Sequence, residues 1–106
     1  MNKGVEMEAP ETTGFIEVIF PSVPGFGIDE RDEIEDTLQE MLENRELGDV
    51  SGSGAGMGVM ILDIDVFDAR NLEETVQVIM EVLKNHSCPS GTRVQINQPY
   101  QKTHQL

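Results

Sequence analysis

The sequence predicts one small α+β domain. Three observations lead to this class. Four segments are rich in β-branched residues or alternate apolar with polar residues, two segments space their apolar residues as a helix does, and their order is β-α-β-β-α-β. The chain has 106 residues, a usual length for one domain with one core.

The first two elements are predicted from local composition. Residues 15–20 are β-branched and aromatic and run up to Pro21, which cannot continue a strand ladder. Residues 21–27 hold two prolines and two glycines and predict a loop. A helix then begins at Asp29, a good N-cap, and ends at Gly48. The predicted buried stripe of this helix is Ile34, Leu38, Met41 and Leu42.

The middle of the chain predicts a β-hairpin. Residues 48–52 are a short, weak strand, and residues 53–58 are a flexible glycine-rich connection. Residues 59–67 form the strongest strand, because the run is long and β-branched.

A second helix and a last strand follow. Asn71 and Glu74 have the spacing of a capping box, and the helix is expected to end near Asn85. Residues 92–97 alternate apolar and polar residues and predict the fourth strand. The predicted inner stripe of the helix is Leu72, Val76, Ile79, Met80 and Leu83.

The order of these elements over residues 14–97 resembles the ferredoxin-like fold. The resemblance implies a two-layer sandwich, with two helices on one face of an antiparallel sheet of strand order 4-1-3-2, and it implies no specific function. Residues 1–13 and 98–106 are polar and aperiodic, so we expect a flexible leader and a flexible C-terminal tail.

The charge and composition exclude several classes of partner. The chain has 20 acidic against 7 basic residues, a net charge of −13, which repels nucleic acids and anionic membranes. It has no apolar run of the roughly 20 residues that span a bilayer, and its start lacks a secretory signal. The single Cys88 cannot form an internal disulfide. We therefore expect a cytoplasmic protein, and no motif calls for a cofactor.

Alternation along the first and third strands predicts an open sheet face with carboxylates. If the two strands are neighbours, Glu17 shares this face with Asp63 and Asp65. Such a trio could bind Mg²⁺ or Ca²⁺ or assist acid–base chemistry, while the simpler interpretation is a solvated or partner-facing surface on which Arg93 balances Glu17. The predicted open-face residues are Phe15, Glu17, Ile19, Ile61, Asp63, Asp65 and Phe67.

No catalytic residue is assigned. The glycines at 48, 52, 54, 56 and 58 join two strands and have no lysine beside them, unlike a phosphate-binding loop. His86 lies close to Cys88 near a helix end and could lower the pKa of the thiol, but no oxyanion donor can be named. An enzyme is the less favoured expectation.

Two features favour a protein partner. Residues 29–46 contain nine acidic and two basic residues, and like charges four positions apart destabilise a helix, so another advantage is implied. Val78 and Val82 widen the apolar arc of the second helix beyond one packed face, which either a loop or another subunit must cover. The predicted partner-binding residues are Asp32, Glu33, Asp36, Glu40, Glu43, Val78 and Val82.

Three hypotheses follow. The leading one is a non-catalytic acidic interaction module, a homodimer that binds another protein; its most concrete form is an inhibitor of a basic partner, similar in charge and size to immunity proteins. The second is a metal-binding or metal-assisted protein that uses Glu17, Asp63 and Asp65. The third is a small-ligand regulatory domain with its ligand between subunits.

Overall fold

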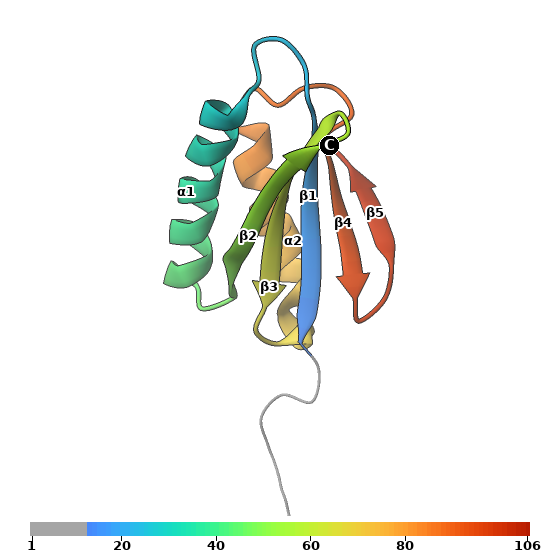
Figure 1. Ribbon diagram of the computed structural model, residues 1–106. Coiled ribbons are helices and arrows are strands. Elements are labelled where there is room, and N and C mark those ends of the chain that lie inside the picture. Colours follow the sequence, from blue (N-terminus) through green and yellow to red (C-terminus); the bar gives the residue numbers. More distant parts are fainter. Residues whose placement is uncertain (1–12) are drawn as a thin grey trace, which may run out of the picture.

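The structure, a computed structural model, describes residues 13–106, so the predicted leader lies outside it apart from Thr13. Figure 1 shows one antiparallel sheet with both helices on the same face. In chain order the elements are β1 (Gly14–Pro21), α1 (Ile28–Asn44), β2 (Gly48–Gly56), β3 (Val59–Val66), a 3-10 turn (Ala69–Asn71), α2 (Leu72–Lys84), β4 (Arg93–Gln98) and β5 (Lys102–Gln105).

The sheet differs from the expected one. It has five strands in the order β2-β3-β1-β4-β5, and each neighbouring pair is antiparallel. The predicted four-stranded ferredoxin-like sandwich is therefore wrong, because the sheet has a fifth strand beyond β4. The fifth strand comes from residues 102–105, inside the segment expected to be a flexible tail. Backbone pairing with β4 holds these largely exposed residues, so no hydrophobic alternation marks them in the sequence.

β2 is also longer than its composition predicts. Residues 53–56, expected in a flexible connection, pair with β3 up to Gly56 opposite Val59. Met57 and Gly58 then turn the chain with φ values of 53° and 82°, as two-residue hairpin turns require. Pairing of the backbone continues the strand here although its small side chains bury little apolar surface.

α1 begins at Ile28, one residue before the predicted Asp29 cap. The preceding residue is Gly27, whose backbone N–H donates to Oε1 of Glu30 at 2.6 Å. The side chain three positions into the helix thus satisfies a free amide at its start, and Asp29 is not the N-cap.

α1 also protects the free edge of β2. The backbone N–H of Val50 donates to Oε1 of Gln39 at 2.8 Å, and Nη1 of Arg31 donates to the carbonyl oxygen of Gly54 at 2.9 Å. Side chains of α1 therefore form hydrogen bonds with backbone groups at the edge of β2 that could otherwise pair with a strand of another chain.

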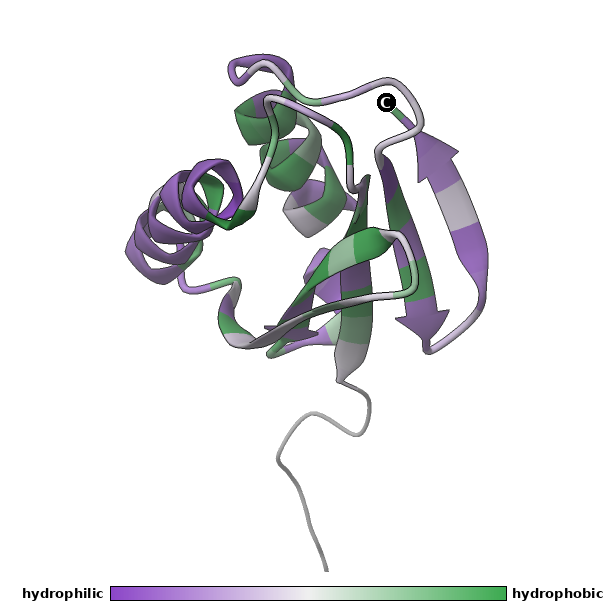
Figure 2. Ribbon diagram, turned by 45° about the horizontal axis from the view of Figure 1, so that its top comes forward, coloured by the Kyte–Doolittle hydropathy of each residue, from purple (hydrophilic) through white to green (hydrophobic). Residues whose placement is uncertain are grey.

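The core lies between the sheet and the two helices. The residues of β3 that alternate with the predicted open-face positions lie in this core, since Met60, Leu62, Ile64 and Val66 are at most 3% exposed. Figure 2 shows the same division on α1, which turns hydrophobic residues inward and hydrophilic residues outward. Neither α1 nor α2 is long and apolar enough to cross a membrane, and the same holds for every helix in residues 13–106. The buried residues of α1 are Arg31, Ile34, Leu38 and Leu42.

Candidate functional site

Exposed carboxylates gather on one side of α1. At 100° per residue the five that the sequence singles out lie within an arc of roughly 100°, on the side of α1 turned away from the core. All five are exposed, and Figure 2 shows this hydrophilic outer side. We call this surface the acidic face; it consists of Asp32, Glu33, Asp36, Glu40 and Glu43.

The nearest cation is largely withdrawn from the solvent. Arg31 is only 7% exposed, because its guanidinium bonds to the Gly54 carbonyl, while its Nη2 lies 3.3 Å from Oδ1 of Asp32. Of the two arginines in residues 29–46, Arg45 is thus the one left exposed. Sequence reasoning missed the burial of Arg31, although its spacing from Ile34 puts it on the buried stripe.

The open face of the sheet brings the three predicted carboxylates onto adjacent positions. Glu17 lies directly opposite Asp63, and Asp65 follows on the same side of β3. Partial burial, and then the charges of Glu17 and Asp65, raise the pKa of Asp63 above its ordinary value. The site therefore costs electrostatic energy when all three groups are ionised.

Amides rather than an arginine accompany Glu17. Nδ2 of Asn97 donates to Oε1 of Glu17 at 2.8 Å, and Nε2 of Gln95 donates to Oδ1 of Asn97 at 2.9 Å. The expected balance by Arg93 is wrong, because the register sets Arg93 opposite Ile19 and no ion pair joins Arg93 to Glu17 in the described chain. Residues 13–106 contain no group of three or more acidic, His or Cys side chains arranged to hold a metal ion, so the metal alternative gains no support.

The apolar residues of the open face offer less surface than alternation predicts. Ile19 is only 6% exposed, and Phe15 and Ile61 are half-buried. Phe67, which follows β3, is 48% exposed. The open face is therefore mainly polar around a few partly covered apolar groups.

Val78 and Val82 do not form a partner surface. They are 2% and 4% exposed and belong to the core, because α2 packs against both the sheet and α1. The wide apolar arc of α2 is thus a consequence of two intramolecular contacts, and the predicted role of these valines in binding a partner is wrong.

The thiol of Cys88 is not activated by its neighbour. Nδ1 of His86 lies 2.9 Å from the Val82 carbonyl oxygen, while Sγ of Cys88 donates to the Leu83 carbonyl oxygen at 3.4 Å. Burial raises the pKa of the Cys88 thiol, which disfavours the nucleophilic thiolate.

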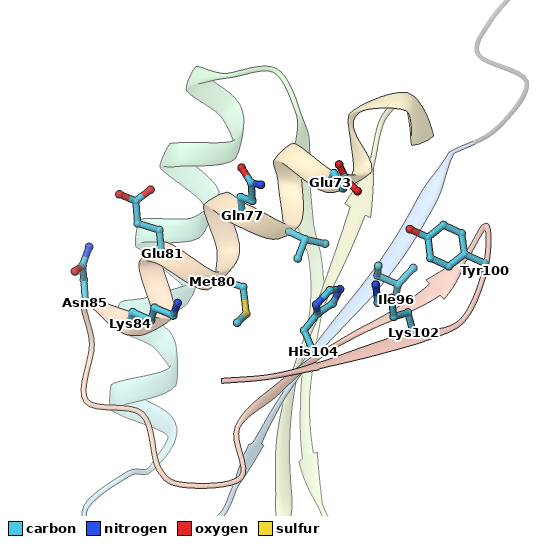
Figure 3. A pocket seen from close by; sticks show the side chains of 11 residues that line it. Glu73, Gln77, Met80, Glu81, Lys84, Asn85, Ile96, Tyr100, Lys102 and His104 are labelled. Carbon is cyan, nitrogen blue, oxygen red and sulfur yellow. The ribbon is translucent and has the colours of Figure 1, made fainter.

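A cleft between α2 and the β4–β5 edge was not anticipated. It has a volume of about 690 Å³ and opens on the helix-covered side of the sheet (Figure 3). Pairing sets Lys102 opposite Ile96 and His104 opposite Val94, so both side chains face α2. The cleft depends on β5, which explains why a sequence analysis without that strand cannot find it. Its lining residues are Glu73, Val76, Gln77, Met80, Glu81, Lys84, Asn85, Ile96, Tyr100, Lys102 and His104.

No protein-family model, curated protein or solved structure matches this chain. A functional assignment therefore has to come from the charges and geometry of its own residues.

Proposed function

We propose that this chain is a non-catalytic interaction module that binds a basic protein through the acidic face of α1. The observation that carries the proposal is the set of five exposed carboxylates on one arc of the helix, beside an arginine that is buried. A helix that places negative charge outward in this way attracts a partner rich in lysine and arginine over a distance of about one Debye length.

Repulsion between the carboxylates of the acidic face destabilises α1, and binding of a basic partner would offset this effect. Asp36 has a like charge four residues before it, at Asp32, and another four residues after it, at Glu40. Each pair destabilises the helix by about 0.2–0.5 kcal/mol, and lysine or arginine side chains of a partner would relieve this repulsion. In its most specific form the proposal makes the chain an inhibitor that covers a basic functional surface.

The experiment compares two variants of equal charge. In the first, Glu33→Gln, Asp36→Asn and Glu40→Gln neutralise the acidic face. In the control, Asp65→Asn, Glu74→Gln and Glu81→Gln remove three exposed carboxylates from other elements. Each immobilised protein is incubated with lysate of the source cells at about 50 mM and about 300 mM NaCl, and retained proteins are quantified by mass spectrometry.

We expect a basic protein that the wild type and the control retain, that the acidic-face variant loses, and that higher salt releases. Equal retention by the two variants would show that only overall charge matters and would overturn the proposal. Retention that is indifferent to salt would contradict it as well.

A further inference from the structure

The cleft between α2 and β5 has the size of a small-molecule site. Its volume of about 690 Å³ lies within the roughly 300–1,000 Å³ of typical ligand pockets. Val76 and Ile96 are buried and Met80 is half-buried, and these three side chains supply its apolar surface. The cleft can therefore remove an apolar ring or short chain from water.

Polar donors converge on this apolar surface from two elements. Lys84 comes from the last turn of α2, while Lys102 and His104 come from β5. Figure 3 shows Met80 extending from α2 and His104 from β5 into the space between the two elements, with Tyr100 at one end. His104 is half-buried, so its imidazole lies at the boundary between apolar wall and solvent.

Within residues 13–106, no ion pair neutralises Lys84 or Lys102. Ion pairs in residues 13–106 join Arg31 to Asp32 and Arg70 to Asp68, and none joins Lys84, Lys102 or His104 to an acidic side chain. Glu73 and Glu81 lie along the cleft, but Figure 3 shows Glu81 directed away from β5. Two lysines that line one cleft and have no ion-pair partner within residues 13–106 stand out in a chain with 20 acidic and only 7 basic residues.

We infer that this cleft binds a small organic anion, a molecule with an apolar ring or short chain that carries a carboxylate, sulfonate or phosphate. The apolar part contacts Val76, Met80 and Ile96, and the thioether of Met80 suits an aromatic ring. The anionic group lies beside the ammonium group of Lys102 and the imidazole of His104, which share one face of β5, while Lys84 lies at the opposite end of the cleft. This site lies within one chain and is independent of the acidic face, so it is distinct from a ligand site between subunits.

The test uses a fluorescent aromatic sulfonate, 8-anilinonaphthalene-1-sulfonate, as the probe, and its uncharged relative N-phenyl-1-naphthylamine as the matched ligand. We expect saturable binding of the sulfonate to the full chain at one site. Lys102→Gln raises the Kd of the sulfonate by about three- to tenfold, and Lys84→Gln, at the opposite end of the cleft, raises it less. Both leave the Kd of the uncharged relative within about twofold.

The control variant is Arg45→Gln, which makes the same change in net charge at an exposed position on the C-terminal end of α1. It leaves the Kd of the sulfonate within about twofold of the wild type. An equal loss of affinity for the sulfonate in Arg45→Gln and Lys102→Gln would show that only the net charge of the protein matters, and it would overturn the inference. An equal loss of affinity for the uncharged ligand would also overturn the inference, because the lysines would then not interact with the anionic group.

Methyl NMR spectra of the methionines locate the probe. Met80 lines the cleft, whereas Met57 is fully exposed in the turn between β2 and β3. The sulfonate is expected to shift the Met80 methyl resonance and to leave that of Met57 in place. A shift of Met57 without a shift of Met80 would place the probe elsewhere and refute the site.

Discussion

Arg31 brings a guanidinium into the contact between α1 and β2. Its Nη1 donates a hydrogen bond to the Gly54 carbonyl oxygen, whereas its buried Nε has no hydrogen-bond partner in the described chain. Burial of a charged group is expensive unless hydrogen bonds replace the lost water. Arg31 therefore holds β2 against α1 and places a positive charge next to Asp32 of the acidic face.

Arg31→Ala is expected to lower the free energy of unfolding by about 1–3 kcal/mol, because it removes a charged hydrogen bond and the packing of the side chain against β2. Urea denaturation followed by circular dichroism measures the change. Arg45→Ala, at an exposed position on the same helix, is the control and should change stability by no more than about 0.5 kcal/mol. Equal effects of the two substitutions would show that Arg31 has no structural role.

Asp63 gives a prediction about pH. Its pKa is raised above the ordinary value of 3.8, so the folded state favours the protonated carboxyl. The resulting contribution to stability is fully present below pH 3.8 and is lost as the pH rises through the folded pKa. Asp63→Asn should therefore be more stable than the wild type at pH 7, by about 0.2–1 kcal/mol, and equal to it near pH 3. The midpoints of urea denaturation at the two pH values test this prediction. A variant that is less stable than the wild type at pH 7 would contradict the assigned cause.

At the scale of elements, β2 shows how a strand with few apolar side chains is held. It pairs with β3 over its length and offers its other edge to Gln39 and Arg31 of α1. Its glycines are not equivalent. A Cβ at position 48 would collide with the carbonyl oxygen of Asp65, whereas a Cβ at position 54 meets nothing within 4 Å.

Gly48→Ala is expected to destabilise the fold by about 1–3 kcal/mol, because the backbone of β3 must move to admit the methyl group. Gly54→Ala, in the same strand, should be neutral or slightly stabilising, since alanine restricts the unfolded chain more than glycine does. Thermal unfolding of the two variants provides the comparison. Similar losses at both positions would mean that β2 depends on glycine flexibility in general rather than on the close approach at Gly48.

At the scale of the whole molecule, electrostatic repulsion dominates. The net charge is −13, and residues 13–106 contain two ion pairs that could oppose the repulsion. A compact chain with this charge destabilises itself, and salt screens the effect. The same screening should weaken the binding of a basic partner and favour association of two copies.

The thermal midpoint should therefore rise when NaCl is increased from about 0.02 M to about 0.3 M, a range over which the Debye length falls from about 20 Å to about 6 Å. Scanning calorimetry at neutral pH measures the midpoint. A midpoint that falls with salt would mean that attractive pairs outweigh the repulsion, contrary to the charge pattern of the surface.

The sequence by itself determined which residues of β3 face the core, and it found Ile34, Leu38 and Leu42 but not Arg31 on α1, because periods of 2 and 3.6 are local properties of the chain. Met60, Leu62 and Ile64 are buried as their alternation predicts, and the same alternation puts Asp63 on the open face. The pairing of β1 with β3 then sets Glu17 beside Asp63. The carboxylates of the acidic face are exposed for the same local reason.

Only the tertiary structure decided the rest. β5 exists because its backbone pairs with β4, and Val78 and Val82 are buried because α1 lies beside α2. The cleft follows from the position of β5 beside α2. The physical reason is that a polar strand is stabilised by hydrogen bonds to a distant segment, and a side chain is buried by whatever packs against it. Neither partner can be identified from the local pattern of residues.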